Sequence, residues 1–73
     1  MDIKEIPYTD KYPVMYQVYL SNKCVVVQSH KKESFYKMIE YIESNNLGDN
    51  YFKYPESFKT KLVISGFDIK KMG

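Results

Sequence analysis

The stretch "VMYQVYLSNKCVVVQ", residues 14–28, decides the fold. Its two runs of β-branched and aromatic residues, 14–20 and 24–28, are separated by the turn-forming letters "SNK". Such runs on either side of a short polar turn are typical of a β-hairpin. The sequence therefore predicts two antiparallel strands joined by a tight turn.

The register of this hairpin decides which residues enter the core. Successive side chains of a strand point to opposite faces, so the length of the turn fixes which residues share a face. A two-residue turn gives one entirely apolar face, whereas a three-residue turn mixes polar residues into it, and we prefer the even-numbered turn. Its apolar face consists of Val18, Leu20, Val25 and Val27. The mixed face holds Met15, Gln17, Tyr19, Cys24, Val26 and Gln28.

One helix is expected directly after the hairpin, over residues 29–46. Apolar residues recur there at the i, i+3, i+4 and i+7 spacing of a single helix face. These residues are Phe35, Met38, Ile39 and Ile42. Ser29 is placed at the N-cap because its hydroxyl can accept a backbone N–H. The letters "NNLG", residues 45–48, end the helix, because Asn and Gly tolerate the left-handed conformation of a C-terminal cap.

The remaining segments complete a small α+β protein. Residues 1–13 are read as an irregular N-terminal segment that could supply a fourth, edge strand. The stretch "KLVISGFDIK", residues 61–70, is read as the C-terminal strand, with Gly66 marking a bulge. We predict a single domain over residues 1–73, a two-layer sandwich in β-β-α-β order. Its mainly antiparallel sheet has three or four strands and carries one helix on one face.

The connection over residues 47–60 carries large aromatic rings, although its Gly, Asn, Asp and Pro residues are those of a loop. A disordered segment would lack such rings, so this loop is expected to be ordered. We expect Phe52 and Phe58 to cover the core. Tyr51 and Tyr54 are expected to face outward, because Tyr is enriched at recognition surfaces and its hydroxyl needs a partner when buried. The alternative is one packed cluster of all four rings.

Residues for catalysis or metal binding are scarce. Cys24 is the only cysteine and His30 the only histidine, which is too few for a closed four-ligand zinc site. No third group is signalled that would orient them as nucleophile and base, and Cys24 is read as a small packed residue. We therefore expect a protein without enzymatic activity, with no catalytic residue, no cofactor and no metal.

The charge pattern argues against a dedicated reader of nucleic acid. All eleven basic residues are Lys, and nine acidic residues bring the net charge to +2. Arg, which is absent, is the side chain best suited to bidentate recognition of phosphate and guanine. Binding of single-stranded nucleic acid through Tyr stacking and Lys–phosphate contacts is the alternative function. The single thiol and the lack of an apolar run near ~20 residues indicate a cytoplasmic protein without membrane association.

These observations favour a protein–protein interaction module. A chain this short depends on packing or on a partner for stability, and one helix leaves the mixed sheet face uncovered. The Lys-, Tyr-, Asn- and Ile-rich composition is that of an AT-rich genome, so we expect a phage- or mobile-element-encoded inhibitor or modulator of a host protein, acting in the host cytoplasm. A homodimer is the other arrangement expected. The predicted contact residues are Tyr51, Lys53, Tyr54, Met15, Tyr19 and Val26.

Overall fold

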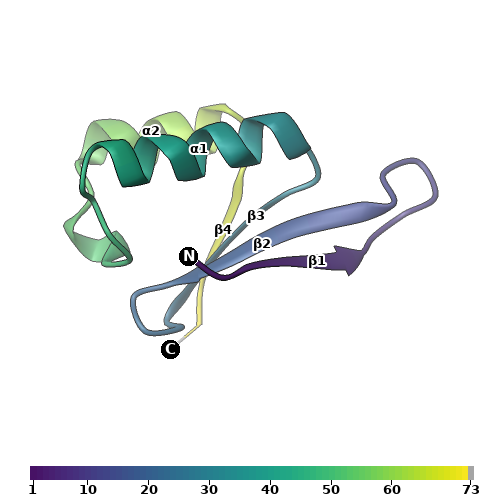
Figure 1. Cartoon of the computed structure of the whole chain (residues 1–73), viewed down its shortest axis with the longest axis horizontal. Helices are drawn as coiled ribbons and strands as arrows, with labels where there is room; N and C mark the ends of the chain where they lie inside the picture. Colours follow the sequence, from purple (N-terminus) through teal and green to yellow (C-terminus); the bar gives the residue numbers. More distant parts are fainter. Residues whose placement is uncertain (73) are drawn as a thin grey trace.

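In the computed structural model, which describes residues 1–72, one sheet of four strands carries two helices (Figure 1). The strands are β1 (Ile3–Pro7), β2 (Val14–Leu20), β3 (Val25–Ser29) and β4 (Asp68–Lys71). The helices are α1 (Lys32–Ser44) and α2 (Glu56–Ile64), with the short 3-10 helix η1 (Tyr51–Lys53) between them. The strands lie in the order β1-β2-β3-β4, and each neighbouring pair is antiparallel. The α+β class is thereby confirmed.

The β2–β3 hairpin has the predicted register. Leu20 lies opposite Val25, and Val18 lies opposite Val27. All four side chains are buried in the core cluster that the helices share with the sheet. A strand pattern of period two was therefore sufficient to assign both faces of this hairpin.

The turn of this hairpin explains why the even-numbered register forms. The Cys24 N–H donates to the Ser21 carbonyl oxygen at 3.1 Å, which closes a two-residue turn at Asn22 and Lys23. Both of these residues, and Ser21 before them, have a left-handed backbone, with φ of 55°, 68° and 52° respectively. A type I′ turn requires this conformation at both central positions, and its twist matches that of the strands. Asn22 accepts it readily, whereas Lys23 adopts it at some cost.

Helix α1 presents the predicted apolar stripe to the sheet, but it starts later than predicted. Phe35 and Ile42 on this stripe are fully buried. Ser29 is not the N-cap, because it is the last residue of β3 and pairs with Tyr16 across the sheet. Its Oγ instead accepts the N–H of Lys31 at 3.1 Å, at the bend between strand and helix.

Both helices end in a Schellman cap, in which a residue with a left-handed backbone follows the helix. This residue is Asn46 after α1, with φ of 54°, and Gly66 after α2, with φ of 86°. After α2 the N–H of Phe67 donates to the Leu62 carbonyl oxygen at 3.2 Å, and both side chains are buried. The predicted role of the Asn pair in ending α1 is confirmed. Gly66 ends a helix and is not the strand bulge that we predicted.

The predicted β-β-α-β order with a single helix is wrong, because α2 takes up part of the segment read as the C-terminal strand, residues 61–70. The first thirteen residues contribute the edge strand β1, the fourth strand that the sequence left open. Leu62 lies four residues after Phe58, so a helix buries the two together. Val63 and Ile64, whose β-branched side chains favoured a strand, are 64% and 78% exposed on the outer side of α2.

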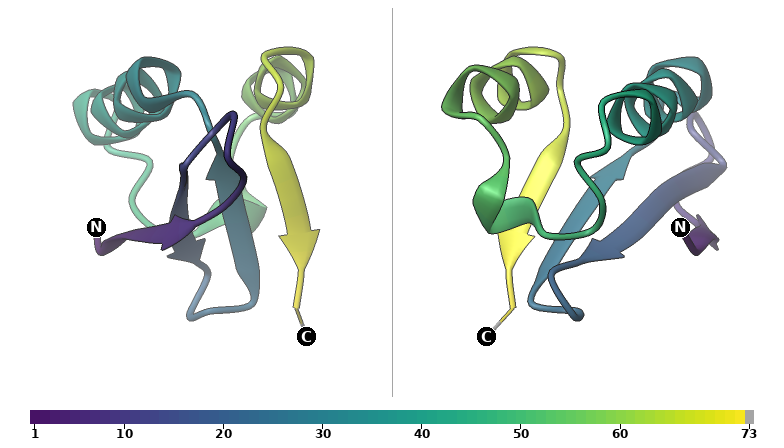
Figure 2. Two further views of the ribbon diagram at one scale, coloured as in Figure 1. Left: turned by 90° about the vertical axis from the view of Figure 1, so that its right-hand side faces the viewer. Right: turned by 60° about the vertical axis from the view of Figure 1, so that its left-hand side comes forward.

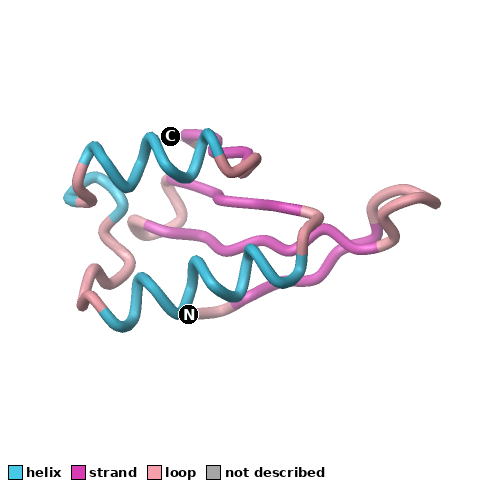
Figure 3. Tube along the Cα trace, turned by 90° about the horizontal axis from the view of Figure 1, so that it is seen from above, coloured by secondary structure: helices cyan, strands magenta, loops and turns pink. Residues whose placement is uncertain are grey.

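The molecule has two layers, with both helices on the same face of the sheet (Figure 2). Seen from above, α1 and α2 run side by side along the sheet, with α2 on the side of β4 (Figure 3). They are antiparallel, because α1 leads away from the end of β3 and α2 returns the chain to β4 (Figure 1). Within residues 1–72, no element covers the opposite face of the sheet.

Candidate functional site

The aromatic segment around η1 packs into the core. Tyr51 and Tyr54 are only 7% and 3% exposed, whereas Phe52 is 52% exposed. The expected orientations are therefore wrong for these three rings, and only Phe58 is buried as predicted. Lys53 lies exposed beside them. This burial leaves little of either Tyr ring for a partner to contact.

The period of the 3-10 helix explains this reversal. With three residues per turn, residues i and i+3 lie on the same side, so Tyr51 and Tyr54 point inward together and Phe52 points outward. The buried Tyr54 hydroxyl has a partner after all, because it donates to the Gly48 carbonyl oxygen at 2.7 Å. The segment is tied to the β2–β3 turn by the N–H of Tyr51, which donates to Ser21 Oγ at 2.8 Å.

Burial of the Tyr54 phenol makes the free energy of unfolding depend on pH in the alkaline range. Burial, and next the negative charge of Asp49, raise the pKa of Tyr54 to about 12. The unfolded chain has a Tyr pKa of about 10, so the stabilisation is complete below pH ~10 and is lost as the pH rises towards 12. We expect chemical denaturation to show a larger loss of stability between pH 9 and 11, approximately, for the wild type than for Tyr54→Phe. Equal losses would show that Tyr54 does not titrate differently in the folded state.

The sheet face opposite the helices is the first candidate for a binding surface, and we call it the open face. Strand pairing places these side chains on it: Lys4, Ile6, Met15, Gln17, Tyr19, Val26, Gln28, Asp68 and Lys70. Met15 and Val26 are only 6% and 4% exposed, yet neither belongs to the core cluster beneath the helices.

The centre of the open face is polar and its two ends are apolar. The Gln17 amide Nε2 donates to Gln28 Oε1 at 2.6 Å, across β2 and β3. Tyr19 lies opposite Val26 on one side of this amide pair, and Met15 lies on the other side. The structure thus places three of the predicted contact residues on one face, as alternation along the strands predicted. It separates them from Tyr51, Lys53 and Tyr54, which lie in the connection between the helices.

A cation stands beside the aromatic ring of the open face. The Lys4 Nζ atom lies 5.0 Å from the centre of the half-buried Tyr19 ring. Lys70 on β4 pairs with Val26 and brings a second ammonium group to the same face, while Asp68 is the nearest acid on that strand. Asp2 and Asp49 line the same hollow as Lys4 and Tyr19, so charges of both signs surround this aromatic ring.

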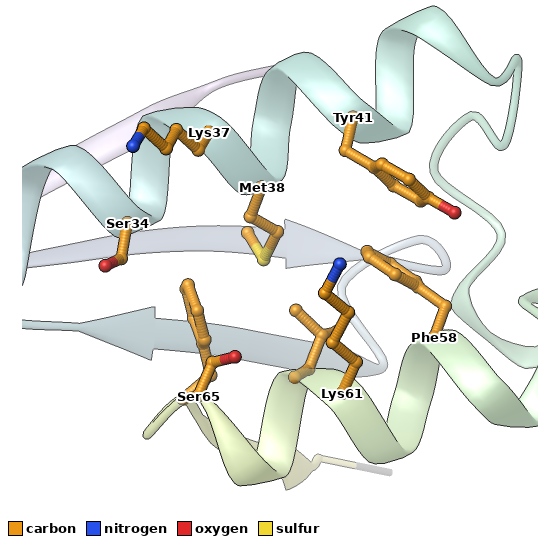
Figure 4. Close-up of a pocket in the computed structure, with 9 residues that line it drawn as sticks. Ser34, Lys37, Met38, Tyr41, Phe58, Lys61 and Ser65 are labelled. Atoms are coloured by element: carbon orange, nitrogen blue, oxygen red, sulfur yellow. The ribbon is translucent and has the colours of Figure 1, made fainter.

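The second candidate site is a groove that the sequence did not predict. The helices α1 and α2 enclose a groove with a volume of 360 Å³, lined by apolar side chains, serines and lysines (Figure 4). Four of its residues have the i, i+3, i+4 and i+7 spacing of one helix face, namely Phe58, Lys61, Leu62 and Ser65. Only two of the four are apolar, so this spacing gives no amphipathic signal that would have revealed α2.

Other reactive groups do not assemble into a site. Cys24 is exposed and not packed as we expected, and His30 stacks on the hairpin between β1 and β2, its ring centre 4.1 Å from that of Tyr12. Among residues 1–72, no group of three or more His, Cys, Asp or Glu side chains could hold a metal ion. None of the helices in that range has the length and apolar character needed to cross a membrane. No family model matches the chain, and neither the curated proteins nor the solved structures compared with it gave a match.

Proposed function

We propose that the protein is a non-enzymatic binding module that docks onto another protein through its open face. The observation that carries this proposal is the four-stranded sheet that is covered by helices on one side only. Its uncovered side holds the half-buried Tyr19 beside Lys4, whereas Met15 and Val26 are 6% and 4% exposed and leave little area for a partner to contact. Tyr is among the residues enriched in the cores of protein interfaces.

The charges around Tyr19 have both signs and do not select an acidic or a basic partner. Lys4 and Lys70 share the open face with Asp68, while Asp2 and Asp49 line the same hollow as Lys4 and Tyr19. Complementary charges on a partner would act mainly on the rate of association and on specificity. An inhibitor or modulator of a host protein, the form that the composition favours, would act by covering a surface of its target.

Single-stranded nucleic acid is the less favoured partner. Stacking platforms on sheets use two or three aromatic rings, and Tyr19 is the sole aromatic ring among the paired residues of the open face. Tyr16, which could have been a second platform, points to the helix side and is buried. Lysines without Arg would leave a diffuse attraction that fades at physiological salt.

The test compares two single substitutions on opposite layers of the molecule. Tyr19→Ala removes the ring from the open face, whereas Tyr36→Ala removes an exposed ring, 42% exposed, from α1. We expect the wild type and Tyr36→Ala to retain the same protein from a low-GC bacterial lysate. With that protein purified, Tyr19→Ala should weaken binding by ~2 kcal/mol, roughly 30-fold, as at an interface hot spot.

Three results would contradict the proposal. The first is a partner that binds Tyr19→Ala as tightly as the wild type. The second is a wild-type dimer in sedimentation that dissociates on Tyr19→Ala, which would assign the open face to a second copy. The third is sub-micromolar binding of single-stranded oligonucleotides that persists at about 150 mM salt, because diffuse lysine attraction is already screened there.

A further inference from the structure

The groove between α1 and α2 is built from two matching stretches of sequence. On α1 it is lined by Ser34, Lys37, Met38 and Tyr41, and on α2 by Phe58, Lys61, Leu62 and Ser65. Read in opposite directions, both stretches place a serine, a lysine with an apolar neighbour, and an aromatic ring at the same helical spacing. Because the helices are antiparallel, the serines lie at one end of the groove and the aromatic rings at the other, while the lysine and its apolar neighbour come in opposite order on the two helices (Figure 4).

This arrangement gives the groove two chemically different ends. At one end the Tyr41 and Phe58 rings stack, with their centres 4.8 Å apart and their planes 18° from parallel. At the other end Ser34 on α1 and Ser65 on α2 lie on opposite sides of the groove, and the Met38 side chain points into its middle (Figure 4). The result is an apolar floor with hydroxyl groups at one end.

The charged side chains along the groove are both cations. The Lys61 ammonium extends toward α1, with its Nζ 5.8 Å from the centre of the Tyr41 ring, and the Lys37 ammonium lies toward Ser34 (Figure 4). No acidic residue lines the groove, and across residues 1–72 the one ion pair joins Lys59 to Glu56. Glu33 and Glu40 flank Lys37 along α1, but their carboxylates do not reach its ammonium group.

We propose that this groove binds a small organic anion with an apolar body, such as an aromatic carboxylate. The body would lie on Met38 and Leu62, and the carboxylate would meet the Lys61 ammonium group, while Lys37 adds positive charge at the Ser34 end of the groove. Ammonium groups next to apolar walls attract an anion more strongly than they would in open water. The volume of 360 Å³ lies at the lower end of small-molecule pockets, which favours a compact ligand over a peptide helix. This site is independent of the open face on the other side of the sheet.

The probe that tests it is 2-naphthoate, with 2-naphthalenemethanol as the neutral analogue of the same shape. Titrations followed by amide chemical shifts should show 2-naphthoate binding with shifts around Met38 and Leu62. The alcohol should bind at least tenfold more weakly, because it lacks the charge. The double variant Lys37→Gln/Lys61→Gln should lose that tenfold preference and leave binding of the alcohol unchanged.

The matched control removes two positive charges outside the groove. Lys31→Gln/Lys32→Gln has the same net charge as the test variant and alters exposed residues that do not line the groove. It should bind 2-naphthoate as the wild type does. The proposal is overturned by equal affinity for the two probes, by shifts centred on Tyr19 and the open face, by an equal loss in both double variants, or by no binding of either probe at millimolar concentration.

Discussion

Tyr54→Ala is expected to lower the free energy of unfolding by about 3–5 kcal/mol, the range for a large buried aromatic side chain. Tyr54 is 3% exposed, its ring centre lies 5.5 Å from that of Phe58, and its hydroxyl bonds to the Gly48 carbonyl oxygen. The substitution removes all of these contacts at once. Because a domain of this size has a total stability of about 5 kcal/mol, urea denaturation should find Tyr54→Ala close to unfolded.

Two companion variants separate the causes of that loss. Phe52→Ala, two residues away in the same segment, should change stability by less than ~0.5 kcal/mol, because the Phe52 ring is 52% exposed. Tyr54→Phe keeps the ring and should lose only the hydroxyl contribution, about 1 kcal/mol. If Phe52→Ala lowered the free energy of unfolding as much as Tyr54→Ala, the side of η1 that carries Phe52 would be the side packed against the core.

The elements that the sequence predicted well are those with a clean hydrophobic period. In the hairpin, alternation leaves one register with a wholly apolar face, so Val18 and Val27 were placed correctly. In α1 the apolar residues fall on a single stripe over thirteen residues, and the two Asn residues mark its end. Placement of Met15, Tyr19 and Val26 on the open face followed from the same alternation.

Helix α2 and the inward Tyr pair could not be read in the same way. The run Leu62–Val63–Ile64 is short and β-branched, and a short apolar run fits a strand as well as a helix. Its outer side is apolar, so the nine-residue helix has almost no amphipathic contrast to detect. The groove between the helices therefore could not be predicted from the sequence, since half of its lining belongs to α2. The period of three in η1 left a single signal, the spacing of Tyr51 and Tyr54, within a segment that otherwise resembles a loop.

Phe35→Ala is the second substitution with a large expected effect, again about 3–5 kcal/mol of lost stability. The Phe35 ring is fully buried at the joint between α1 and the sheet. Its centre lies 6.1 Å from that of Tyr16 on β2 and 6.3 Å from that of Phe67, which precedes β4. Thermal melting followed by circular dichroism should show little folded Phe35→Ala at room temperature.

The next residue along α1 supplies the control for this prediction. Tyr36 also touches the Phe35 ring, at 6.2 Å between centres, but it is 42% exposed, so Tyr36→Ala should cost at most ~1 kcal/mol. Phe35→Leu, which refills part of the space, should fall between the two alanine variants. If Phe35→Ala had the same melting temperature as the wild type, packing of the Phe35 ring would not be what holds the helices on the sheet. Because Phe35 contacts Tyr16 on β2 and Phe67 just before β4, its loss should destabilise α1 and the β4 connection together, in one transition with the same midpoint by circular dichroism and by Tyr fluorescence.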